Sequence, residues 1–189
     1  AYRIYAKAHA RSVRDWASRL PDAQCNNSKG RWVGDSTWRA QIRAVTQSKQ
    51  HHLEILLDVK KAFEHVRRGS VAIEAKLQDY PLVPLLASLT SYAWPRYIGL
   101  DGLLAEPIVA SRGIAAGSAF ATFELWCLLR NAINSLQIEF PRSTICIHVD
   151  DLCLTVVEDT AEEALNEAKG IIDRAITEFT HTEGLPFAD

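Results

Sequence analysis

Apolar and polar positions along the chain form short continuous runs in some segments and helical stripes in others. Apolar runs at 53–59, 144–149 and 152–157 have the length and the β-branched content of buried strands. Helical apolar periodicity covers 2–20, 70–93, 118–136 and 160–180. The interleaving of these segments predicts an α+β fold in which helices cover one face of an antiparallel sheet.

Turn and capping residues refine these boundaries. Pro81 and Pro84 interrupt 70–93, which predicts two shorter helices in place of one. The dipeptide Asp101-Gly102 between two apolar runs is a strong signal for a β-hairpin. Ser118 precedes the long apolar segment and is predicted to be the N-cap of its helix.

The composition is that of a globular protein, with 48% hydrophobic and 23% charged residues among 189. The four cysteines have neither the spacing of a structural zinc site nor the density of a disulfide scaffold. There is no apolar stretch of about 18 residues and no secretory signal, so we expect an intracellular protein, nuclear or cytoplasmic, without a membrane partner. The absence of methionine, even at position 1, suggests an excerpt of a longer polypeptide.

Charge is distributed unevenly between the two ends of the chain. Residues 1–49 carry ten Lys and Arg against three acids, whereas residues 150–189 carry eleven acids against two basic residues. A basic end and an acidic end suit an anionic partner that is held at one end and approached by cations at the other. Two solvated faces of opposite charge are the alternative explanation.

Three carboxylates each interrupt or end an apolar strand, namely Asp58, Asp150 and Asp151. A charge in such a place costs free energy unless something neutralises it. If the first strand pairs with the 144–157 hairpin, the three side chains converge on a site for divalent cations. Two Mg²⁺ ions about 4 Å apart, or Mn²⁺ in their place, support phosphoryl transfer. The alternative is a polar hairpin tip and an acid that merely ends a strand.

Three motifs occur in a characteristic order: DVKKAF at 58–63, GIAAGS at 113–118 and HVDD at 148–151. With their strand, loop, helix and hairpin contexts, they resemble the palm of reverse transcriptases of the non-LTR retrotransposon and group II intron type. The segment RWVGDST at 31–37 is similar to the turn that precedes this palm. The resemblance implies a polymerase palm at 53–189, truncated at its C-terminus, a partial fingers segment at 1–52, and no thumb.

The resemblance also implies roles for single residues. Asp58 and Asp150 would be the principal metal ligands, Asp151 the supporting acid, and the Val59 carbonyl an additional ligand. Phe63 falls on the position of the steric gate, where an aromatic ring excludes the 2′-hydroxyl of a ribonucleotide. The remaining implied nucleotide-binding residues are Lys61, Ala62, Ala116, Gly117 and Arg31.

Two positions depart from the family pattern. Ala116 stands where the family usually has a glutamine whose amide supports the nucleotide, so nucleotide placement is in doubt. His148 stands where the family has a tyrosine or phenylalanine two residues before the paired acids, and we expect it to be packed and neutral.

The resemblance implies an RNA-directed DNA polymerase of a retroelement, which transfers nucleotides from dNTPs to the 3′-hydroxyl of a DNA primer on an RNA template. This fragment alone is expected to lack turnover. Three alternatives remain. They are an inactive, nucleic-acid-binding relic, an RNA-dependent RNA polymerase palm, and an α+β interaction domain whose acids are scattered over the surface.

Overall fold

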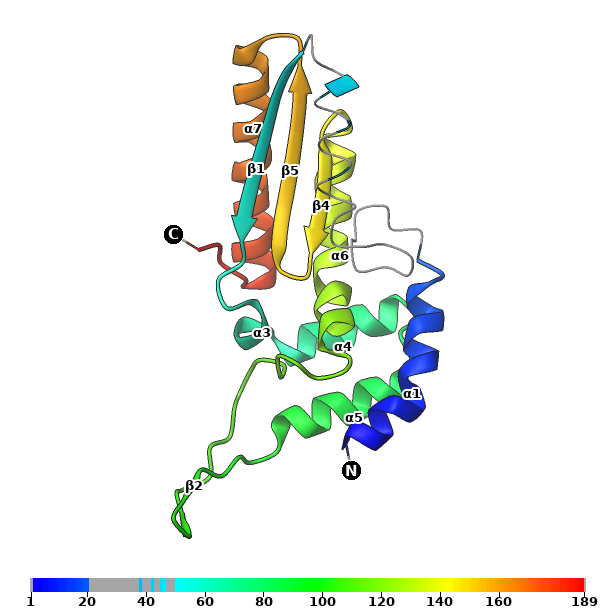
Figure 1. The fold of residues 1–189 in the computed structure, drawn as a ribbon, viewed down its shortest axis with the longest axis vertical. Coiled ribbons are helices and arrows are strands. Elements are labelled where there is room, and N and C mark those ends of the chain that lie inside the picture. Colours follow the sequence, from blue (N-terminus) through cyan, green and yellow to red (C-terminus); the bar gives the residue numbers. More distant parts are fainter. Residues whose placement is uncertain (1, 21–37, 39–41, 43–44, 47–49, 189) are drawn as a thin grey trace.

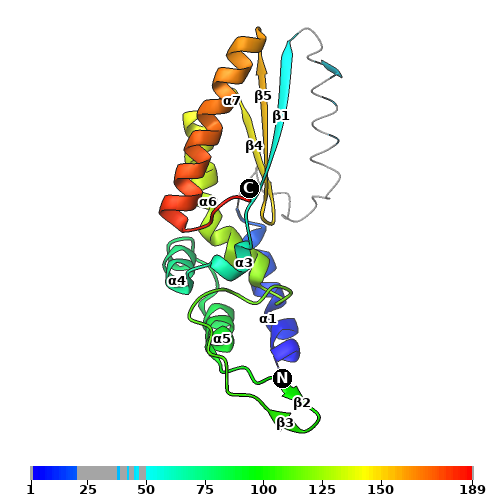
Figure 2. The same cartoon turned by 90° about the vertical axis from the view of Figure 1, so that its left-hand side faces the viewer.

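A three-stranded antiparallel sheet forms the upper half of the molecule in a computed structural model that describes residues 2–20, 38, 42, 45–46 and 50–188 (Figure 1). Its strands are β1 (His51–Asp58), β4 (Thr144–His148) and β5 (Asp151–Glu158), in the order β1-β5-β4. Two long helices, α6 (Ala121–Glu139) and α7 (Ala161–Ile176), lie on one side of the sheet (Figure 2). The predicted α+β class, with helices on one face of an antiparallel sheet, is confirmed.

The alternation of side chains along the strands explains this layering. Leu152, Leu154 and Val156 of β5 are fully buried, as are Ile145 and Ile147 of β4, and they face the two helices. On α7 the buried residues Ala164, Ala168, Ile171 and Ala175 follow helical spacing and complete the core. The opposite sheet face is more exposed, and it carries Glu54, Leu56 and Asp58 of β1 and Asp151 of β5.

Further helices pack below the sheet. They are α1 (Tyr2–Ala17), α3 (Ala62–His65), α4 (Arg68–Leu77) and α5 (Leu82–Ala93). Pro81 separates α4 from α5 as predicted, whereas Pro84 lies in the first turn of α5, where a missing amide hydrogen costs little. Trp16 connects α1 to the end of α4 by a hydrogen bond, because its indole nitrogen donates to the Gln78 carbonyl at 2.7 Å.

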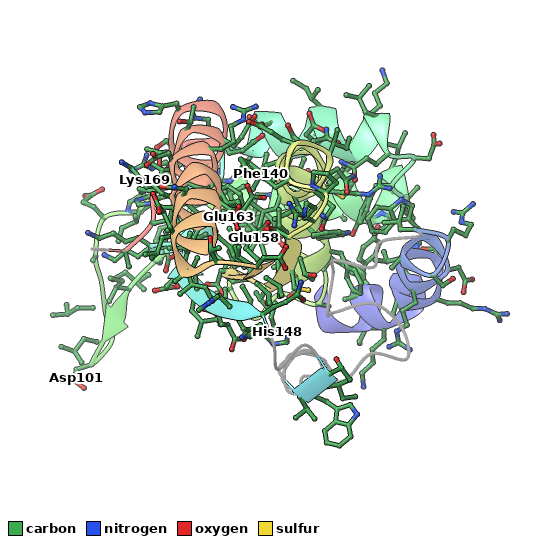
Figure 3. The ribbon with its side chains drawn as sticks, turned by 90° about the horizontal axis from the view of Figure 1, so that it is seen from above. Asp101, Phe140, His148, Glu158, Glu163 and Lys169 are labelled. Carbon is green, nitrogen blue, oxygen red and sulfur yellow. The ribbon has the colours of Figure 1, made fainter. Side chains whose placement is uncertain are left out.

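A small hairpin projects from this helical half, as predicted from Asp101-Gly102. Its strands β2 (Gly99–Leu100) and β3 (Leu103–Leu104) are joined by a turn with φ of 48° at Asp101 and 82° at Gly102. Positive φ at both central residues is the type I′ geometry that suits a two-residue hairpin. Figure 3 shows Asp101 at the outer end of the hairpin, away from α6 and α7.

One predicted helix start differs from the structure. α6 begins at Ala121, and the residue before it, Phe120, makes no side-chain cap. Ser118 is therefore not the N-cap. Its hydroxyl lies 2.9 Å from the hydroxyl of Tyr92. The last helix continues past α7 as a π-helical segment, η1 (Thr177–Glu183), and ends where Gly184 takes a φ of 70°. Its predicted start is confirmed, since Thr160 Oγ1 accepts from the Glu163 amide at 3.2 Å.

Three further findings concern predictions from composition. Cys127 is buried, Cys146 and Cys153 are half-buried, and these three described cysteines form no disulfide. Within the described ranges, no helix is long and apolar enough to cross a membrane. The predicted boundary between residues 1–52 and 53–189 stays a prediction, since most of 21–49 lies outside the described residues.

Glu124 is a fully enclosed acid in the middle of the core. It lies on the inner face of α6, and Tyr92 donates its hydroxyl hydrogen to Glu124 Oε2 at 2.8 Å. Burial raises the pKa of Glu124 to about 7, although hydrogen bonds from Ser88 and Tyr92 act in the opposite direction. The native protein therefore holds a proton on Glu124 at a pH where an unfolded chain has lost it.

We expect the free energy of unfolding to fall as the pH rises from about 4.5 to about 7, and to level off above that. The contribution of Glu124 to this fall is at most about 3 kcal/mol, at 1.4 kcal/mol per tenfold change in proton affinity. Glu183 is half-buried, its pKa is also raised to about 7, and it adds a smaller slope of the same sign. Urea unfolding at pH 5 and pH 8 should show a shallower decline for Glu124→Gln than for the wild type. Equal slopes in the two proteins would contradict this assignment.

Candidate active site

The three predicted catalytic acids lie at one corner of the sheet. Asp58 is the last residue of β1 and Asp151 the first of β5, and the two are directly opposite partners in the antiparallel register. Asp150 precedes Asp151, and its carbonyl accepts from the Val59 amide at 3.4 Å. Opposite residues of an antiparallel pair have Cβ atoms about 5 Å apart and point to the same face. The predicted pairing of the Asp58 strand with the 144–157 hairpin is thus confirmed.

The turn at this corner differs by one residue from the prediction. His148 pairs with Asp151, so the two loop residues are Val149 and Asp150, and Asp151 belongs to β5. The register with β1 explains the shift, because it continues as far as the pair of Asp58 with Asp151. The two neighbouring acids therefore differ in setting, since one lies in the turn and the other in the strand.

Unusual backbone conformations flank the corner. Val149 has a φ of 60° and Lys61 a φ of 49°. The left-handed region costs about 1 to 2 kcal/mol for a residue with a Cβ, and it is rarest for β-branched residues such as valine. Such strain persists only where the surroundings impose it, and it concentrates at functional sites. Both predicted acid-bearing segments, 58–63 and 148–151, carry one strained residue.

Like charges act on one another at the corner. The pKa of Asp150 is raised, first by partial burial and then by the negative charges of Asp151 and Asp58, while His148 acts in the opposite direction. Within the part of the chain that the structure describes, however, no three His, Cys, Asp or Glu side chains are already arranged as a metal-binding group. The backbone therefore brings the three acids to one corner, but their side chains are not oriented as a set of metal ligands.

The C-terminal segment covers the end of β1. The Lys60 amide donates to the Pro186 carbonyl at 2.8 Å, and the Ala188 amide donates to the Asp58 carbonyl at 2.8 Å. Between these bonds, Val59 forms an antiparallel bridge with Phe187 and is 1% exposed. The backbone that carries Asp58 is thus held on both sides, by β5 and by residues 186–188.

The predicted nucleotide-binding residues come from two segments that the backbone joins. Phe63 is half-buried against the core at the start of α3, after exposed Lys61 and buried Ala62. The Gly113 amide donates to the Val66 carbonyl at 2.7 Å, and the Ile114 amide donates to the Phe63 carbonyl at 2.8 Å.

The loop that follows Ile114 carries Ala116 and Gly117, which are both exposed. It is therefore anchored to the segment that carries Phe63. The prediction for Arg31, and that for the turn at 31–37, lie outside the described residues.

A cavity of about 430 Å³ lies between α1 and the start of α6. Its walls are apolar, and two cations of α1, Lys7 and Arg14, line it together with the backbone around Gly117. The sequence analysis noted the basic N-terminal end without singling out these two residues. Helical spacing alone would have placed them on one face of α1, since they are seven residues apart.

Comparison with known proteins bears on the fold. No family model matches the chain, and no curated protein matches it. Among solved structures, the apo telomerase from Candida tropicalis truncated from its C-terminal domain superposes with a TM-score of 0.66, at 13% identity and over 98% of this chain. The fold is similar to that of telomerase.

Two further telomerase structures agree with this likeness. Telomerase from Candida albicans in complex with the TWJ fragment of telomeric RNA gives a TM-score of 0.66 at 10% identity, and another apo telomerase from Candida tropicalis gives 0.60 at 12% identity. Each match covers 98% of this chain, and the chain spans 34–40% of the length of the telomerases. At this level of identity the likeness concerns the fold alone, and it agrees with the predicted α+β architecture with an antiparallel sheet.

Proposed function

We propose that this chain is the core of an RNA-directed DNA polymerase of a retroelement, which extends a DNA primer with dNTPs. One observation carries the proposal: Asp58 and Asp151 are opposite partners at the end of the sheet, with Asp150 in the adjoining turn. The similarity of the fold to telomerase supports it. An interaction domain with acids scattered over its surface would not need this register.

The proposed cofactor is a pair of Mg²⁺ ions, with Mn²⁺ as a substitute. Carboxylate and carbonyl oxygens are the ligands that these ions prefer, and Asp58, Asp150, Asp151 and the Val59 carbonyl offer that chemistry. A divalent cation would also neutralise the like charges that raise the pKa of Asp150. Binding requires the carboxylates to turn toward one another, because the described side chains do not yet form a ligand set. When bound, the ions would supply activation of the primer hydroxyl and stabilisation of the leaving pyrophosphate.

The protein's own residues position the substrates in this proposal. Phe63 lies against the sugar of the incoming nucleotide and excludes a 2′-hydroxyl, while the backbone amides of Lys61 and Ala62 approach its phosphates. Gly117 allows close approach, since a Cβ there would have nothing within 4 Å. Ala116 leaves the nucleotide without the side-chain amide that the family usually supplies.

Nucleic acid is the proposed partner of the cavity beside α1. The Candida albicans telomerase is described in complex with an RNA fragment, which supports an RNA partner for this fold. In the described part of the chain, the side chains of Lys7 and Arg14 have no salt-bridge partner, so their charges are available to phosphates.

We expect Lys7→Glu combined with Arg14→Glu to weaken binding of a single-stranded RNA oligonucleotide about tenfold or more at physiological salt. If each cation contacts one phosphate, the slope of log affinity against log salt should fall by about 1.4. Fluorescence anisotropy over a salt series measures both quantities. The matched control is Arg11→Glu with Lys76→Glu, which reverses two charges outside the cavity. Equal weakening by both pairs would mean that net charge alone decides, which contradicts the cavity site.

Primer extension tests the proposed activity. The intact natural protein should add dNTPs to a DNA primer on an RNA template in the presence of Mg²⁺. Preference for NTPs over dNTPs would instead indicate an RNA-dependent RNA polymerase, against the assignment of Phe63 as steric gate. RNA binding without any incorporation would favour an inactive relic.

A further inference from the structure

Arg68 makes an unusual set of contacts at the start of α4. Its guanidinium donates three hydrogen bonds to three main-chain carbonyls: Nε to Gly113 at 2.7 Å, Nη1 to Ala110 at 2.8 Å, and Nη2 to Arg112 at 3.0 Å. These carbonyls are 42 to 45 residues away in the sequence. The planar guanidinium has five donors in a fixed arrangement, and no other side chain can make the same three contacts.

The segment that Arg68 holds is also in close contact with the residues just before α4. Besides the two backbone hydrogen bonds from Gly113 and Ile114, the Gly113 Cα packs so tightly that an added Cβ would lie 2.9 Å from the Glu64 carbonyl oxygen. Hydrogen bonds from a charged donor are stronger than those between neutral groups. The Arg68 contacts therefore add to the attachment of residues 110–114 onto residues 63–68.

The two attached segments continue into the two halves of the proposed nucleotide site. Phe63 is the first residue of segment 63–68. The loop with Ala116 and Gly117 follows segment 110–114, and Ala116 is two residues beyond Ile114. The loop is held on its far side as well, because the Ser118 hydroxyl lies 2.9 Å from the Tyr92 hydroxyl and Phe120 is buried just before α6. The anchoring of residues 110–114 fixes the near side of the loop, and so contributes to the separation of Phe63 from Gly117.

We propose that Arg68 is a positioning residue that fixes the separation between the Phe63 ring and the Gly117 loop, and so determines how well the incoming nucleotide fits. The inference rests on the proposed polymerase function. Arg68 acts through the main chain in this assignment, because its Nε, Nη1 and Nη2 each donate to a main-chain carbonyl. Its loss should therefore affect nucleotide binding and sugar selection more than the chemical step.

The first test is kinetic. In primer extension by the intact natural protein, Arg68→Ala should raise the KM for dNTP about tenfold, leave kcat within about threefold, and narrow the preference for dNTP over NTP. Arg68→Lys should behave like Arg68→Ala, because an ammonium group keeps the charge but cannot bridge three carbonyls. Guanidinium ion added at millimolar concentration should lower the KM of Arg68→Ala and leave that of Arg68→Lys unchanged. Lys76→Ala, an exposed cation on the same helix, is the matched control and should leave both constants unchanged.

The second test does not depend on activity. Hydrogen exchange at the Gly113 and Ile114 amides should be faster in Arg68→Ala and Arg68→Lys than in the wild type, and unchanged in Lys76→Ala. An active wild type whose KM for dNTP is insensitive to Arg68→Lys would overturn the inference, as would a loss confined to kcat. An inactive wild type would count against the proposed function instead, and unchanged exchange at these two amides would then overturn the anchoring role by itself.

Discussion

Replacement of Asp150 by asparagine is expected to lower primer extension by at least about a thousandfold, equivalent to about 4 kcal/mol of transition-state stabilisation. Asparagine keeps the size of the side chain and one oxygen but loses the charge that a divalent cation requires. The assay is single-nucleotide incorporation by the intact natural protein on a primed RNA template. The same loss is expected for Asp58→Asn, because Asp58 faces the same corner from β1.

Thermal unfolding separates this effect from misfolding. Removing one of several like charges relieves repulsion, so Asp150→Asn should unfold at the same temperature as the wild type or higher. Asp173→Asn, which removes an exposed acid from α7, is the matched control and should keep full activity. Synthesis at the wild-type rate by Asp150→Asn would refute the assignment of the acids.

A second large effect is expected for Gly113→Ala, on stability. Gly113 has a φ of 86°, where a Cβ is strained, and that Cβ would lie 2.9 Å from the Glu64 carbonyl oxygen and 3.2 Å from the Phe63 carbonyl oxygen. Strain of about 1 to 2 kcal/mol adds to the cost of moving rigid backbone apart, for a total of about 2 to 4 kcal/mol. Urea unfolding followed by circular dichroism measures the loss.

Gly117→Ala is the matched comparison for this prediction. Its φ of 80° is nearly the same, but the Cβ would meet nothing within 4 Å. We therefore expect only the conformational cost of about 1 to 2 kcal/mol. If both variants lost the same stability, the close packing of Gly113 against α3 would not be the cause.

The elements of the fold were largely predictable, because each depends on local patterns. The run at 53–59 has strand composition with an acid as its next-to-last residue, and β1 ends at that acid, Asp58. The predicted boundaries were wrong where contacts with residues distant in the sequence determine the local structure. Asp150-Asp151 is a plausible turn on local preference, and valine is a poor residue for a positive φ, yet pairing with β1 and β4 extends β5 to Asp151 and places Val149 in the turn. Likewise Ser118 is a residue type that favours the N-cap, but α6 begins three residues later, at Ala121.

The residue types of the candidate site could be predicted from the sequence, but the residues that hold its segments in place could not. The three acids stand out because they interrupt apolar strands, and the register brings them to one corner. Nothing in the sequence marks Arg68, because its partners are main-chain carbonyls more than forty residues away, and carbonyls have no residue identity. The cavity beside α1 was missed for a similar reason, since its walls come from two helices that are distant in the sequence.

The attachment of residues 110–114 to residues 63–68 also limits how the site can adapt to a substrate. Two segments that are joined by backbone hydrogen bonds and a guanidinium move together, so induced fit between them would require several bonds to break at once. The turn that carries Asp150 contains Val149 with a φ of 60°, so backbone strain lies in that turn and outside the attachment. In the proposed polymerase, the two joined segments would therefore meet the nucleotide as one preformed unit.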